Sequence, residues 1–165
     1  MTFQQSIPKL VIGGIGLGSM PSIALQALEQ GLDSPSLRIL AGLREDENEF
    51  ILRRYLEETL RELSIELPNK RQAVILVALT IADDIFDNRR PIVEGVADMF
   101  REAIDRYPFH EETIQSRYDS IELEEIYVLF LNAESDRDCG LPNEAREQEL
   151  LMKLRNWSMR MRNPS

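Results

Sequence analysis

The amino-acid sequence predicts an all-α fold, and three observations lead to that prediction. The longest apolar run, Ala73 to Ala82, is long enough for a core helix buried on most sides. Prolines stand at or just before the start of successive helical patterns, where the first helical N–H has no partner in any case. No strand-like alternation of useful length lies between these patterns. We therefore expect a compact antiparallel helical bundle of about five longer helices with two short N-terminal helices.

Chain length and composition fit one globular domain. The chain has 165 residues, of which 43% are hydrophobic and 29% charged. Glycines crowd the N-terminal stretch, which makes it a poor apolar or membrane-spanning helix. We assign residues 1–20 to a flexible N-terminal arm and residues 21–165 to a single helical domain.

Two short helices are expected after the arm. The first spans Pro21 to Gln30, and the second begins at Pro35 with Asp33 or Ser34 as its N-cap. Gly31 closes the first helix as a typical left-handed stop, and Gly42 ends the second.

Five longer helices follow. Asp46 and Glu49 form a capping-box-like start for the first of them. Gly95 lies inside the third, where it costs about 1 kcal/mol relative to alanine and therefore predicts a close helix–helix approach. A loop is expected from Ser135 to Asn143. The five helices cover about 46–63, 69–88, 92–104, 111–133 and a final segment with the stripe Leu150, Leu154, Trp157 and Met161.

Charge is unevenly distributed along the C-terminal third. Residues 111–136 hold eight acids against one base, whereas residues 150–165 hold four bases and no acid. A short connection usually joins neighbouring helices, so we expect the two segments to face each other. At least one of the four bases, Lys153, Arg155, Arg160 or Arg162, should then form an ion pair with the acidic segment. The alternative is that the basic helix docks on a membrane or a partner.

Asp83, Asp84 and Asp87 close the apolar run with Asp-Asp-x-x-Asp spacing. On a helix, Asp83 and Asp87 share a face and could together hold Mg²⁺, which takes oxygen ligands. The spacing resembles the first aspartate-rich motif of the isoprenoid synthases, which implies a magnesium-bound diphosphate. That family needs a second acidic motif, for which this chain offers no patterned candidate. The alternative is a solvated helix end whose charge is offset by Arg89 and Arg90.

Other chemistries find little support. The net charge of −10 argues against nucleic-acid binding. His110 and Cys139 are the only residues of their types, so a structural zinc site is close to excluded. Neither belongs to a recognisable nucleophile–base motif. The glycine run from Gly13 to Gly18 lacks the third glycine of a dinucleotide fingerprint and the lysine of a nucleoside-triphosphate loop.

A longer segment, Ala24 to Gly42, reads Ala-Leu-x-x-Leu-x-x-Gly-x-Asp-Ser-Pro-x-Leu-Arg-x-Leu-Ala-Gly. It resembles the N-terminal segment of small uncharacterised bacterial proteins. The resemblance implies a bacterial cytoplasmic protein and carries no activity with it. The lone cysteine also fits a reducing compartment.

These observations favour a non-catalytic protein–protein interaction or accessory module that binds a partner with a basic surface. A membrane or nucleic-acid partner is not expected, and a homo-oligomer is compatible with the composition. The rival hypothesis is a Mg²⁺-dependent enzyme or binder that acts on a phosphorylated substrate through Asp83, Asp84 and Asp87.

Overall fold

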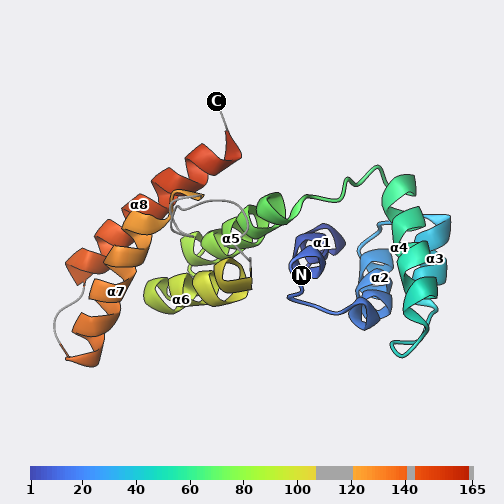
Figure 1. The fold of residues 1–165 in the computed structure, drawn as a ribbon, viewed down its shortest axis with the longest axis horizontal. Helices are drawn as coiled ribbons and strands as arrows, with labels where there is room; N and C mark the ends of the chain where they lie inside the picture. Colours follow the sequence, from blue (N-terminus) through green and yellow to red (C-terminus); the bar gives the residue numbers. More distant parts are fainter. Residues whose placement is uncertain (107–120, 141–143, 164–165) are drawn as a thin grey trace. The chain divides into compact units, whose positions relative to one another are not determined.

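The computed structural model describes residues 1–106, 121–140 and 144–163 (Figure 1). Within these ranges every regular element is a helix, so the all-α prediction is confirmed. The chain divides into two compact units, Met1–Val74 and Ile75–Ser165, whereas the sequence predicted a single domain over residues 21–165. Local patterns place helices along the chain, but they do not show which helices share a core.

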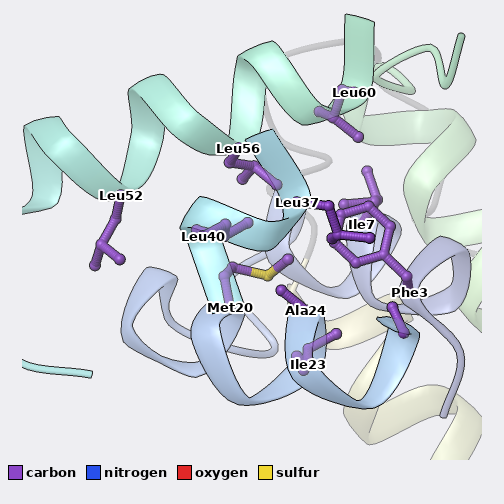
Figure 2. Packing of buried hydrophobic residues seen from close by; sticks show 11 residues of the cluster. Phe3, Ile7, Met20, Ile23, Ala24, Leu37, Leu40, Leu52, Leu56 and Leu60 are labelled. Carbon is purple, nitrogen blue, oxygen red and sulfur yellow. The ribbon is translucent and has the colours of Figure 1, made fainter. Parts of the chain in front are cut away.

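Unit 1 contains four helices and the start of α5. In order these are α1 (Phe3–Val11), the 3-10 turn η1 (Leu17–Ser19), α2 (Met20–Glu29), α3 (Pro35–Ala41) and α4 (Glu49–Glu62). Each of the four helices contributes apolar side chains to one cluster. Figure 2 shows its members, among them Phe3, Ile7, Met20, Ala24, Leu37, Leu40, Leu52, Leu56 and Leu60.

Helix α1 replaces most of the flexible arm that the sequence predicted over residues 1–20. Its N-terminus is closed by a capping box, in which the Thr2 hydroxyl accepts from the Gln5 N–H while the Gln5 side chain accepts from the Thr2 N–H. Phe3 and Ile7, four residues apart on one face, are both buried in the cluster. Burial of this pair and the cap hold the segment as a helix.

The α3 N-terminus is built by side chains from two helices. Ser34 is the N-cap, and its hydroxyl accepts from the Leu37 N–H at 3.2 Å. The Glu62 carboxylate of α4 accepts from the Ser36 N–H at 2.9 Å and from the Ser36 hydroxyl at 2.8 Å. These hydrogen bonds lower the pKa of Glu62 below its usual value, and the one from the Ser36 backbone N–H has the largest effect. A carboxylate at this position also suits the positive end of the helix dipole.

Ser34, one of the two N-cap residues predicted for α3, is confirmed, whereas the predicted start of α4 at Asp46 is wrong. The N-cap of α4 is Asn48, whose side-chain oxygen accepts from the Phe50 N–H at 2.8 Å, and not Asp46. Asp46 is instead paired with Arg44 at 2.7 Å. Asp33 does not cap α3, because its carboxylate accepts from Arg38, and this hydrogen bond lowers the pKa of Asp33.

Unit 2 contains most of α5 and the remaining helices. These are α5 (Lys70–Phe86), α6 (Ile92–Glu102), the 3-10 turn η2 (Ile104–Arg106), α7 (Glu124–Asp138) and α8 (Glu144–Arg162). The predicted core helix is confirmed, since seven of the ten residues from Ala73 to Ala82 are buried in α5. Aromatic rings join α6 to α7: Phe100 lies 5.1 Å from Tyr127 and 5.8 Å from Phe130, measured between ring centroids.

Helix α7 ends later than predicted. The expected loop from Ser135 is helical as far as Asp138, and the turn comes at residues 139–140. The polar residues at 135–138 gave no apolar pattern, but Asp136 forms an ion pair with Arg146 of α8 that favours the extra turn. The earlier part of the predicted helix, residues 111–120, lies outside the described residues.

Candidate functional site

The predicted magnesium ligands lie in the last turns of α5. The helix is closed by Asn88, which has a left-handed φ of 56°. The Asp84 carbonyl oxygen accepts from the backbone N–H of Arg89 at 2.8 Å and of Arg90 at 3.1 Å. This closure brings both arginines back over the acidic helix end.

Arginines pair with all three aspartates. Arg89 lies 2.8 Å from Asp84 and 3.0 Å from Asp87, while Asp83 pairs with Arg162 of α8. The predicted offset by the arginines after the helix is therefore confirmed. Across the part of the chain that the structure describes, no group of three or more His, Cys, Asp or Glu side chains is arranged to hold a metal ion. Magnesium binding at these aspartates stays the rival hypothesis, in which the ion would compete with guanidinium groups.

Arg90 connects the end of α5 to α6. Its guanidinium lies 2.7 Å from Asp98, 3.4 Å from Asp84 and 3.7 Å from Glu102. All four side chains are about a quarter to a third exposed, so water screens this network less than it screens a fully exposed pair. Sequence spacing did not identify the network, because it joins two helices through a residue in the turn between them.

The predicted pairing of acidic and basic segments is confirmed. Lys153 pairs with Glu125, and Arg160 lies 2.9 Å from Glu122. With the Asp136–Arg146 pair, these contacts show that α7 and α8 are antiparallel neighbours (Figure 1). As the residue number of the acid rises toward and along α7, the number of its partner on α8 falls.

Trp157 anchors the same helix pair. Its side chain is fully buried, and its indole N–H donates to the Ile121 carbonyl oxygen at 2.8 Å. The segment before α7 is thereby held against α8 by apolar burial and a hydrogen bond.

The outer faces of these two helices carry exposed apolar side chains. Val128 and Leu131 of α7 are 52% and 43% exposed, and Met152 and Met159 of α8 are 53% and 58% exposed. Both methionines lie on a shallow, open part of the α8 surface, of about 370 Å³, together with Gln148, Leu151, Arg155 and Asn156. Exposed apolar side chains grouped on a helix face are a feature of binding surfaces.

Cys139 and the glycine run are the remaining sequence candidates that the structure describes. His110 lies outside the described residues. Cys139 is exposed in the turn after α7. At Gly18, in the glycine run, an added Cβ would lie 2.6 Å from the Glu45 carbonyl oxygen, so glycine here permits close backbone packing.

Within the described ranges, no helix combines the length and the apolar character needed to cross a membrane. Comparison with protein families, with characterised proteins and with solved structures gives no match to this chain.

Proposed function

We propose that this chain is a non-catalytic protein–protein interaction module whose partner carries a basic surface. The observation that carries the proposal is the outer face of α7. Val128 and Leu131 stand there on one side of the helix, and Glu125, which also pairs with Lys153 of α8, lies in the turn before them. A partner segment that is both apolar and basic would complement this face.

The charge of unit 2 supports the same kind of partner. Residues 75–165 hold 19 Asp and Glu against 11 Lys and Arg, a balance of −8. Such a surface accelerates encounter with a basic protein and disfavours acidic ones. The exposed apolar side chains would supply most of the binding free energy once the partner has docked.

The cytoplasm of a bacterium is the proposed location. Cys139 is a free and exposed thiol, which suits a reducing compartment. The bacterial assignment is supported by the resemblance of the segment from Ala24 to Gly42.

Affinity purification from the native cell with mass spectrometry tests the proposal. The wild type is compared with the double variant Val128→Lys/Leu131→Lys, which places positive charge on the α7 face. Leu25→Lys is the matched control, since Leu25 is 51% exposed on α2 in unit 1. We expect a basic protein to be retained by the wild type and the control, and lost from the double variant.

Salt provides a second criterion. Capture should weaken as salt rises from roughly 50 to 300 mM, because screening shortens the range of charge attraction. If all three proteins retain the same set of proteins, or if the captured partner is acidic, the α7 face is not the binding surface and the proposal is wrong.

A further inference from the structure

Helix α8 has a second face that no other part of the described structure covers. One side of the helix buries Leu150, Leu154 and Trp157. The opposite side contains the two exposed methionines and is exposed along its whole length, from Ala145 to Met159. At 100° per residue, seven exposed residues fall within about a third of the helix circumference. They are Ala145, Gln148, Glu149, Met152, Arg155, Asn156 and Met159.

We propose that this face binds the same face of a second copy of the chain, with the two α8 helices antiparallel and Met152 at the two-fold axis. A two-fold interface requires a patch that complements itself when reversed. The α8 face meets this requirement about Met152 in three successive pairs of positions.

The first pair is electrostatic. Glu149 and Arg155 stand three residues on either side of Met152, so each acid would face the arginine of the other copy. The Arg155 guanidinium stacks on the Phe86 ring with 5.4 Å to its centroid, which orients the side chain while leaving it exposed. A parallel arrangement would instead place Glu149 of one copy beside Glu149 of the other, where like charges repel.

The other two pairs concern hydrogen bonding and shape. Gln148 and Asn156, four residues on either side of Met152, would bring two amide side chains together, and amides can donate to and accept from each other. Ala145 and Met159, seven residues on either side, would place a small side chain opposite a long one. Met152 of one copy would pack against Met152 of the other.

The expected dimer is weak. Its contact residues span 14 steps of helix, or about 21 Å, and a single helix pair buries less than the roughly 800 Å² per partner of a standard interface. This association does not depend on the partner proposed above, because it uses α8 and not α7.

Sedimentation velocity over a concentration series tests the charge pair. The wild type should pass from monomer to dimer as concentration rises. Glu149→Arg and Arg155→Glu should each weaken the dimer at least tenfold, and the double variant should restore it because the pair is re-formed in reverse. Val128→Lys on α7 should leave the dimer unchanged. A wild type that stays monomeric, or a dimer insensitive to both single variants, would overturn the proposal.

Disulfide formation tests the orientation in a Cys139→Ser background. Met152→Cys should form a disulfide-linked homodimer, because position 152 of both copies lies at the two-fold axis. Met159→Cys should not, since its copy would lie about 21 Å away along the helices. A mixture of Ala145→Cys and Met159→Cys proteins should yield the mixed dimer. Homodimers of Met159→Cys would contradict the antiparallel register.

Discussion

Gly95 of α6 packs closely against α5. A Cβ added at this position would meet Ile85 at 2.5 Å from Cγ1 and 2.7 Å from Cδ1, and it would lie 3.4 Å from Cβ of Arg90. Ile85 is itself buried and cannot turn away freely. The glycine that weakens α6 locally is therefore the residue that lets the two helices pack.

Gly95→Ala is expected to destabilise the protein by about 1–3 kcal/mol, because overpacking outweighs the gain in helix propensity. Urea unfolding followed by circular dichroism measures the change. Gly16→Ala is the control: Gly16 has an extended backbone with φ −88° and no atom within 4 Å of the added Cβ. A Gly95→Ala protein as stable as the control would show that α5 and α6 have room to adjust.

The acidic end of α5 offers a test of the magnesium hypothesis. Because Asp83, Asp84 and Asp87 are paired with arginines, we expect Mg²⁺ titration to leave the Tm of the wild type unchanged. Asp84→Asn should lower the free energy of unfolding by roughly 1 kcal/mol, since it removes an acid shared by two arginines. A magnesium-dependent rise in Tm that is lost in Asp83→Asn/Asp87→Asn would instead establish a metal site.

At the scale of helices, a carboxylate at the end of α4 stabilises the beginning of α3. The pKa of Glu62 is lowered in the folded state by its hydrogen bonds to Ser36. A lowered pKa means that the contribution to stability is full above the ordinary value of 4.5 and is lost as pH falls toward the folded-state pKa.

Glu62→Gln should therefore lower stability at pH 7, and the difference from the wild type should shrink as pH falls below about 4.5. Urea midpoints measured at several pH values follow this difference. Glu57→Gln, on an exposed position of the same helix, should show a much smaller effect. A difference that stays constant with pH would mean that the Glu62 charge plays no part in holding α3.

The α7–α8 pair shows how far local patterns reach at this scale. Segregated charge predicted that these helices would be neighbours, and the Lys153–Glu125 and Arg160–Glu122 contacts confirm it. The same patterns placed the end of α7 too early, because the last turn is favoured by the contact between Asp136 and Arg146.

For the whole molecule, the division into two compact units predicts a local response to core mutations. Leu37 is fully buried in the unit 1 cluster, so Leu37→Ala should cost about 2–5 kcal/mol. Native-state hydrogen exchange should show lost protection in α2, α3 and α4, with α7 and α8 unchanged. Equal loss of protection in both units would indicate one cooperative domain, as the sequence alone predicted.

The sequence by itself determined that the chain is all-α and where most helices lie, because apolar periodicity, prolines and N-caps act within a few residues. It also located the tight approach at Gly95 and the acidic end of α5. The tertiary structure decided that Phe3 and Ile7 make α1 part of a core, that the chain forms two units, and that Arg90 and Arg162 meet acids on other helices. Those outcomes depend on contacts between residues far apart in the chain, to which local spacing is insensitive.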